Sequence, residues 1–188
     1  MDAPWGRHDR PEPATDRLVD AANRLYLRNG FDHTTMAQVA TEAGCSRATL
    51  YNYFPSKADL RTAIRNRAAI EIAAATADHV AAIDEPAERI TEAIVFAVDR
   101  VRGNPELAMW FTAEDVGLTS MLAGESDVIE AIAATFIGGP DGDDDLAHLR
   151  ARLVVRLILS LLAHPEPDPA EERRLVGQVV APALAPTR

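Results

Sequence analysis

The sequence predicts an all-α protein, and three observations support that prediction. Alanine is frequent among the 188 residues, and aromatic side chains make up only 5% of them. Alanine is the best helix former, whereas strands need alternating β-branched and aromatic residues, and such runs are short here. Capping residues, and apolar residues three or four positions apart, recur along the chain. The single cysteine, Cys45, excludes an internal disulfide and a cysteine-based zinc site.

The first predicted helix follows a segment without periodicity. Residues 1–14 contain three prolines, which predicts a flexible arm. Thr15 is a suitable N-cap, and Gly30 stands where a helix C-cap belongs. Between them, apolar residues recur at helical spacing, namely Leu18, Ala22, Leu25 and Tyr26.

Two short helices are predicted on either side of Gly44. Thr35 and Gln38 form a capping box at the start of the first one. Its apolar face consists of Met36, Val39, Ala40 and Ala43. Ser46 is the expected cap of the second helix.

The second short helix has Leu50 and Phe54 as its expected buried side, and Pro55 stops it. A further capping box, Ser56 with Asp59, starts the next helix. Its apolar stripe consists of Leu60, Ile64, Ala68, Ile72 and Ala75. Nothing breaks this pattern before Glu85, so the helix is expected to extend over residues 56–85.

The remainder of the chain predicts more helices, separated by a Gly/Asp loop at residues 138–145 and a proline-containing turn at residues 164–169. The expected helices are residues 86–102, a segment from Pro105 through Phe111, a segment from Thr119 or Ser126 to Phe136, residues 146–163 and residues 170–180.

The charge is distributed unevenly between the two parts of the chain. The whole chain has a net charge of −10, which by itself argues against binding to a nucleic acid. Residues 1–67, however, hold ten Arg/Lys and eight Asp/Glu, a net charge of +2, whereas residues 68–188 hold nine and twenty-one, a net charge of −12. Binding to a polyanion depends on the local surface. The asymmetry therefore predicts two parts with different roles.

The most informative stretch is residues 34–57, TTMAQVATEAGCSRATLYNYFPSK. Two short capped helices that cross steeply need a small residue at their contact, and the turn between them needs a residue that accepts positive φ. Ala40 and Gly44 meet these needs. This pattern is typical of a helix-turn-helix motif, whose second helix lies in the major groove of DNA.

Residues 15–64 resemble the DNA-binding domain of the TetR family of bacterial regulators. The matching motifs are the TT start, the A-x-x-A-G-x-S turn, the TLYNYF helix and the PSK-x-x-L exit, in this order. Cys45 replaces the usual aliphatic residue, and Ala48 stands where glycine or proline is common. The resemblance implies a DNA-binding domain at residues 15–60, after the arm at 1–14. It also implies a helical ligand-binding and dimerisation domain at residues 61–188.

The residues expected to contact DNA are Thr35, Ser46, Arg47, Thr49, Tyr51, Asn52, Tyr53 and Lys57. Arg47 could donate two parallel hydrogen bonds to a guanine. The alternative is a solvated surface arginine or a phosphate contact. Tyr51 and Thr49 are candidates for a thymine methyl or a backbone oxygen. Asn52 reads a base or is simply exposed.

Three of these residues are candidates for phosphate contacts. Tyr53 resembles a phosphate-contacting position of the family, although either tyrosine could instead pack beside Phe54. Thr35 can offer its hydroxyl and backbone N–H to a phosphate, or act only as a cap. Lys57 is the only lysine, and at a helix start it is expected to meet a phosphate.

A small-molecule pocket is implied only by the resemblance. The candidate wall residues are Phe96, Met109, Trp110, Phe111, Glu114 and Met121. The alternative is that the apolar ones are ordinary core residues and that Glu114 lies at a solvated helix end. Cys45 is expected to be a packed apolar residue rather than a redox sensor. The five histidines show no metal-ligand spacing, and no cofactor is expected.

The last two long helices are expected to mediate homodimerisation. Residues 146–163 are apolar around most of the helix circumference, and such a helix must be covered on all sides. In the TetR family, the last two long helices pair with their copies in a four-helix bundle. The expected interface residues are Leu149, Leu153, Leu157, Ile158, Leu161 and Leu175.

Together these features favour a homodimeric transcriptional regulator that binds a pseudo-palindromic operator in double-stranded DNA. By resemblance it is most often a repressor that a small-molecule inducer releases from DNA. Two alternatives stay open: a regulator controlled by a protein partner without an inducer, and an enzyme with an appended DNA-binding domain. No catalytic motif supports the enzyme. The absence of a signal peptide and of a long apolar span predicts a cytoplasmic protein without membrane contact.

Overall fold

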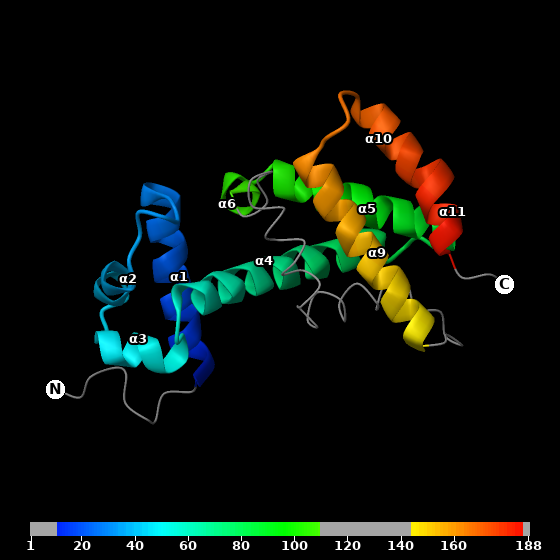
Figure 1. Cartoon of the computed structure of the whole chain (residues 1–188). Helices are drawn as coiled ribbons and strands as arrows, with labels where there is room; N and C mark the ends of the chain where they lie inside the picture. The colour runs from blue at the N-terminus through cyan, green and yellow to red at the C-terminus, as the bar shows by residue number, and fades with distance from the viewer. Residues whose placement is uncertain (1–10, 110–143, 186–188) are drawn as a thin grey trace. The chain divides into compact units, whose positions relative to one another are not determined.

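The computed structural model describes residues 11–109 and 144–185, and the regular elements in these ranges are all helices (Figure 1). They are α1 (Pro11–Asn29), α2 (Met36–Glu42), α3 (Arg47–Tyr53), α4 (Lys57–Val80), α5 (Pro86–Arg102), α6 (Pro105–Ala108), α9 (Asp144–Ala163), α10 (Pro169–Leu175), the π-helix η1 (Val176–Val180) and α11 (Ala181–Leu184). The predicted all-α fold class is therefore confirmed. The helix expected between Thr119 or Ser126 and Phe136 lies outside the described residues.

The chain forms two compact units, which divide between Arg67 and Ala68. The sequence analysis places the boundary a little earlier, between residues 60 and 61. No break in the helix marks either position, because α4 continues from Lys57 to Val80. The first unit therefore contains the helix-turn-helix segment together with the N-terminal turns of α4.

The first unit is built on a core formed by α1, α2, α3 and the start of α4. Its most completely buried large side chains are Leu18, Tyr26, Val39, Leu50 and Leu60. Helix α1 begins at Pro11, earlier than the predicted cap Thr15, so residues 11–14 are helical instead of forming part of a flexible arm. Proline is tolerated in the first turn of a helix, where its missing N–H has no intrahelical partner. Ala14 is buried, which indicates that this turn packs against the unit.

The turn between α2 and α3 has the backbone conformation that the sequence predicts. Gly44 has φ of 70°, in the left-handed region that side chains disfavour. Thr35 and Gln38 form the expected capping box at the start of α2, and Ser46 caps α3. These local features fix where each short helix begins and how the chain turns between them.

Replacing Gly44 with alanine is expected to lower the free energy of unfolding by about 1–2 kcal/mol, the cost of a left-handed conformation with a side chain. A Cβ atom at Gly44 would meet no atom within 4 Å, so the loss comes from the backbone alone. Gly44→Asn is the matched control, because asparagine tolerates this conformation better. Urea denaturation measures the free energy of unfolding of both variants. An equal loss in Gly44→Ala and Gly44→Asn would contradict this reasoning.

The second unit has α5 at its centre. Helix α5 packs against α9 and against the helix formed by α10, η1 and α11 (Figure 1). Its core contains Ile90, Ile94, Val98, Ala151, Val154, Leu161, Val176, Ala181 and Leu184. Helix α4 ends at Val80, earlier than the expected Glu85. A proline disfavours the helical conformation in the residue before it, and Glu85 accordingly has ψ of 119° ahead of Pro86.

The C-terminal helix extends to Leu184, beyond the predicted end at residue 180, because a π-turn precedes Pro182. A proline lacks an N–H and crowds the carbonyl of the preceding turn, and a wider turn relieves both problems. The N–H of Ala181 donates to the carbonyl of Val176, and both residues are completely buried. At Gly177, an added Cβ would lie 3.3 Å from Thr91 Cγ2, so this helix approaches α5 closely.

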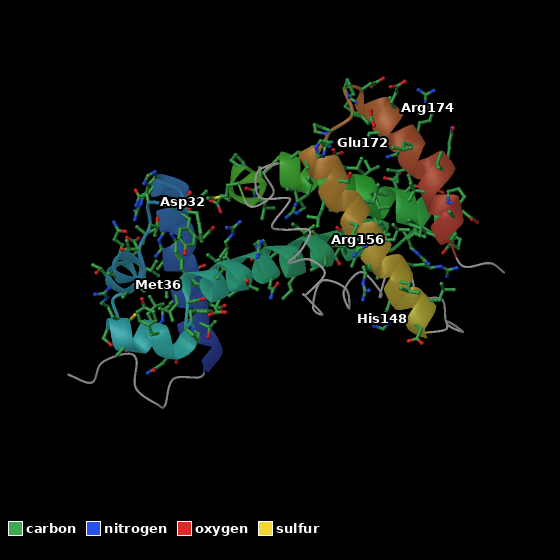
Figure 2. All side chains as sticks on the ribbon, in the orientation of Figure 1. Asp32, Met36, His148, Arg156, Glu172 and Arg174 are labelled. Carbon is green, nitrogen blue, oxygen red and sulfur yellow. The ribbon has the colours of Figure 1, made fainter. Side chains whose placement is uncertain are left out.

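A buried ion pair joins three helices of the second unit. The carboxylate of Glu172, on α10 (Figure 2), accepts hydrogen bonds from both terminal nitrogens of Arg102, each at 2.8 Å. Arg102 Nη2 also donates to the carbonyl of Leu161 on α9, at 2.7 Å. The Glu172 side chain is only 5% exposed. Arg102 at the end of α5 therefore holds the end of α9 and the start of α10 together.

Candidate nucleic-acid interface

Helix α3 presents one face to the core of its unit and the opposite face to solvent. Leu50 on the inner face is completely buried. Arg47, Ala48, Tyr51 and Asn52 are exposed, and their spacing places them on one outer face of the helix. Helix α3 carries no acidic residue. The outer face therefore combines one cation with hydrogen-bonding side chains, which suits the edges of bases and the phosphates beside them.

Ser46 and Thr49 are engaged in capping α3. The N–H of Thr49 donates to the Ser46 hydroxyl at 3.0 Å, and the two hydroxyl oxygens lie 2.8 Å apart. Ser46 is exposed and Thr49 is partly buried. Both residues thus hold the first turn of α3 in shape directly beside Arg47.

The two tyrosines of α3 both reach the surface. Tyr51 is 43% exposed and Tyr53 is 37% exposed, although the sequence analysis left open that one of them packs beside Phe54. Phe54 itself is buried. Both tyrosine side chains are therefore accessible at the C-terminal end of α3, where Asn52 is exposed as well.

Thr35 is exposed at the start of α2, but its polar groups already have partners. Its backbone N–H donates to Gln38 Oε1 at 2.8 Å, and its hydroxyl donates to the same oxygen at 2.9 Å. A phosphate at this helix start would have to displace the Gln38 side chain. The neighbouring Thr34, which the sequence analysis did not select, is buried and donates its hydroxyl to the carbonyl of Gly30 at 2.9 Å.

Lys57 points toward the connection between α1 and α2. Its ammonium group donates a hydrogen bond to the carbonyl of Phe31 and lies 4.1 Å from the centroid of the Phe31 ring. The side chain is partly buried, and burial lowers the pKa of the ammonium group. The sequence carries no local signal for this contact, because the two residues lie 26 positions apart.

Glu42 is the acidic residue closest in sequence to the turn between α2 and α3, and two arginines compensate its charge. The carboxylate of Glu42, at the end of α2, accepts hydrogen bonds from Arg28 at 2.8 Å and Arg24 at 3.3 Å. These two bonds lower the pKa of Glu42, so it remains ionised and paired. Cys45 is partly buried, and burial raises the pKa of its thiol, in keeping with a packed residue rather than a reactive thiolate.

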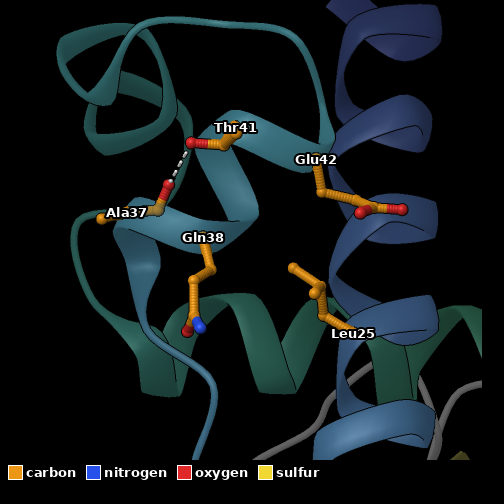
Figure 3. A pocket seen from close by; sticks show the side chains of 5 residues that line it. All are labelled: Leu25, Ala37, Gln38, Thr41 and Glu42. Carbon is orange, nitrogen blue, oxygen red and sulfur yellow. Dashed lines mark hydrogen bonds between the residues drawn. The ribbon is translucent and has the colours of Figure 1, made fainter.

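A shallow depression lies between α1 and α2 (Figure 3). It is lined by Leu25 of α1 and by Ala37, Gln38, Thr41 and Glu42 of α2. The Thr41 hydroxyl donates to the carbonyl of Ala37 at 3.0 Å, and the Glu42 carboxylate is held by the two arginines. This open, partly polar surface lacks the enclosed apolar walls that are typical of a small-molecule site.

Two of the residues expected to line a ligand pocket lie within the described part of the chain. Phe96 on α5 is partly buried and stacks on the imidazole of His79, with ring centroids 4.2 Å apart and planes 13° apart. Met109 directly follows α6 and is also partly buried. Trp110, Phe111, Glu114 and Met121 lie outside the described residues.

The expected dimer residues divide into an exposed group and a buried group. Leu149 and Leu153 on α9 are 58% and 53% exposed, and Leu175 is also exposed. The other three expected residues are more enclosed: Leu157 and Ile158 are partly buried, and Leu161 is a core residue of the single chain. Burial of Leu161 leaves it little surface for a partner. Two exposed apolar residues that the sequence analysis did not select, Leu146 and Val179, extend the exposed group.

None of the helices in the described ranges is long and apolar enough to cross a membrane. Within the same ranges, no cluster of His, Cys, Asp or Glu side chains is arranged to hold a metal ion.

Comparison with known proteins agrees with this geometry. Residues 18–64 match the family model for bacterial regulatory proteins of the tetR family. A helix-turn-helix transcriptional regulator of Mycobacterium tuberculosis is 41% identical over 184 residues, which cover 97% of this chain and 91% of that protein. The repressor KstR of the same species is 27% identical over 150 residues, 78% of this chain and 68% of KstR.

Among solved structures, the TetR-family repressor AlkX from Dietzia has the same fold. It matches with a TM-score of 0.71 and 22% identity, over 95% of this chain and 97% of AlkX. The capped α2–α3 segment and these similarities define a DNA-binding transcriptional regulator of the helix-turn-helix class. The chain belongs to the TetR family of bacterial regulators.

Proposed function

We propose that the protein is a homodimeric repressor that binds a pseudo-palindromic operator and leaves it when a small molecule binds. The observation that carries this proposal is the outer face of α3, where Arg47, Tyr51 and Asn52 are exposed beside a firmly capped first turn. A helix of this kind reads base edges when it lies in the major groove. The two ends of α3, where phosphates would pass, carry Ser46 and Tyr53. Thr49 follows in the first turn of α3, and Thr35 lies at the start of α2.

The dimer is supported by the exposed apolar residues of the second unit. Leu146, Leu149 and Leu153 lie on one side of α9, and Leu175 and Val179 are exposed on the C-terminal helix. Exposed leucines at helical spacing are typical of a helix–helix interface, since water does not favour such a stripe. A two-fold dimer carries two copies of α3, and an operator with two half-sites matches that symmetry.

The repressor role is supported by relatives. KstR and AlkX are both named as repressors. Release by a small molecule is implied by the family, and Phe96 with Met109 is the described part of the candidate pocket wall. A ligand shifts the DNA-bound population only through different affinities for the two states. Native mass spectrometry of the purified dimer, followed by extraction of any retained compound, tests for this ligand.

Arg47→Ala is expected to relax base preference at one position in each half-site. A well-formed arginine–guanine pair contributes about 1–3 kcal/mol of discrimination against the wrong base. The measurement is binding to the preferred duplex and to duplexes with single base changes, at one salt concentration. Arg47→Lys is the matched control, because lysine keeps the positive charge but lacks the planar guanidinium group that donates two parallel hydrogen bonds. Unchanged base preference in Arg47→Ala would show that Arg47 does not read a base.

A further inference from the structure

Asn52 lies on the part of α3 that is turned furthest away from the core of its unit. Leu50 is completely buried and marks the inner side of the helix. Each residue turns an α-helix by about 100°, so Ala48 and Asn52, two positions before and after Leu50, lie on the side opposite to it. Both are exposed. Arg47 and Tyr51 are exposed as well, but the same spacing places them at one flank of this outer face.

The amide group of Asn52 has no structural role in the described part of the chain. Its side chain makes no hydrogen bond to any residue that the structure describes. Gln38, the other amide between residues 34 and 57, accepts two hydrogen bonds from Thr35 and so belongs to the cap of α2. Alanine favours a helix more than asparagine does. Helix formation therefore does not explain an asparagine at this position.

Ala48 allows the Asn52 amide to reach a base edge. The two residues are four positions apart, so they are neighbours on the outer face of α3. The Cα–Cβ bond of Asn52 is tilted toward the helix N-terminus, and hence toward the turn that carries Ala48. Because the Ala48 side chain is a single methyl group, the backbone of α3 can come close to the floor of a groove at this point. A side chain as short as asparagine needs such an approach to contact a base.

The chemistry of the amide matches one base. A carboxamide offers an N–H donor next to a carbonyl acceptor. In the major groove, adenine presents its N7 acceptor beside its N6 donor, whereas guanine presents two acceptors. Two parallel hydrogen bonds between an asparagine and these adenine atoms discriminate against other bases by about 5- to 150-fold. The guanidinium of Arg47 only donates hydrogen bonds, and it suits guanine instead.

We propose that Asn52 is a specificity-determining residue that reads an adenine in each half-site of the operator, with Ala48 providing the close approach. The proposal rests on the function proposed above. When α3 lies in the major groove, the side opposite its core faces the base edges, and the phosphates lie along the two walls of the groove. The outward position of Asn52 therefore favours a base over a phosphate.

Binding to a panel of labelled duplexes tests the proposal. The panel contains the site enriched by the wild-type full-length protein and every single base change in one half-site, at one salt concentration. At one position we expect the wild type to prefer adenine by about 5- to 150-fold, and Asn52→Ala to bind all four bases within about twofold. Preference at the other positions is expected to stay unchanged.

Asn29→Ala is the matched control for this experiment. Asn29 is also an exposed asparagine at the C-terminal end of a helix, but it belongs to α1 and not to α3. We expect this variant to bind the whole panel as the wild type does. Circular dichroism confirms that both variants are folded at the assay temperature.

A modified base tests the same contact from the side of the DNA. Replacing the preferred adenine with 7-deazaadenine removes the N7 acceptor and leaves pairing with thymine intact. The wild type is expected to lose about two- to tenfold in affinity, the effect of one hydrogen bond, whereas Asn52→Ala is expected to lose none. The wild-type measurement does not depend on how any variant folds.

Three results would overturn the proposal. Equal weakening of Asn52→Ala on every duplex would identify a phosphate contact. Unchanged affinity and unchanged base preference in Asn52→Ala would identify a solvated side chain. Relaxed preference at a position where the wild type prefers a base other than adenine would assign Asn52 to a different base. Failure of the wild type to enrich any duplex is a separate result, which contradicts the proposed function itself.

Discussion

Replacing both Leu149 and Leu153 with glutamate is expected to convert the proposed dimer to a monomer. Both side chains are more than half exposed in the single chain and lie on one side of α9. Burial of one leucine contributes about 1.5–3 kcal/mol, and a dimer buries each of these positions twice. Even a partial loss of this burial free energy, with charged side chains now facing the interface, is expected to raise the Kd of the dimer by about a thousandfold or more. Sedimentation velocity over a range of concentrations measures the change.

The matched control is Ile70→Glu. Ile70 on α4 is 48% exposed, so it is similarly apolar and accessible, but it does not belong to the exposed leucine group of α9. We expect this variant to stay dimeric. A dimer that persists in the Leu149/Leu153 double variant would place the interface elsewhere on the chain. Operator affinity is expected to fall together with dimerisation, because a monomer contacts one half-site at a time.

Glu172→Ala is expected to lower the free energy of unfolding by about 3 kcal/mol. Removing one partner of a buried ion pair leaves the other charge without compensation, which typically costs about 3–5 kcal/mol. Arg102 is 30% exposed, so water recovers part of this cost and the expected value lies at the lower end. The variant also loses the two hydrogen bonds that join the end of α5 to α10. Urea denaturation of the full chain measures the change.

The neighbouring Glu171 provides the control for this experiment. It pairs with Arg174 at 3.6 Å, and both side chains are about 60% exposed. Exposed pairs contribute about 0–1 kcal/mol, so Glu171→Ala is expected to have little effect on stability. Similar losses in the two variants would contradict the importance of burial for the Arg102–Glu172 pair.

Features that depend on nearby residues could be predicted from the sequence. The capping box of Thr35 and Gln38, the cap at Ser46 and the turn at Gly44 each depend on residues within three positions of one another. Their physics is local, and the structure confirms them. Exposure of Arg47 and burial of Leu50 followed from helical spacing alone.

Features that depend on tertiary packing were missed. Phe31 and Lys57 are distant in sequence, so spacing could not reveal that the lysine lies on the ring. Leu161 and Leu149 look alike in the apolar pattern of α9, and only the packing of α5 decides that one is core and the other exposed. The last helix was expected to end at residue 180, but the π-turn at residues 176–180 accommodates Pro182 and the helix continues to Leu184.

The most direct test of the central claim is selection of genomic DNA fragments by the full-length protein. The protein is first unfolded and refolded to remove any bound small molecule, and retained fragments are sequenced after binding at moderate salt. We expect a recurring two-fold symmetric site, with half-site centres separated by about 34–36 Å or a multiple of it. Arg47→Ala is expected to retain fragments whose site has lost base preference at one position in each half-site. Retention of DNA by the wild type without a symmetric motif, or no retention at all, would contradict the assignment as an operator-binding dimer.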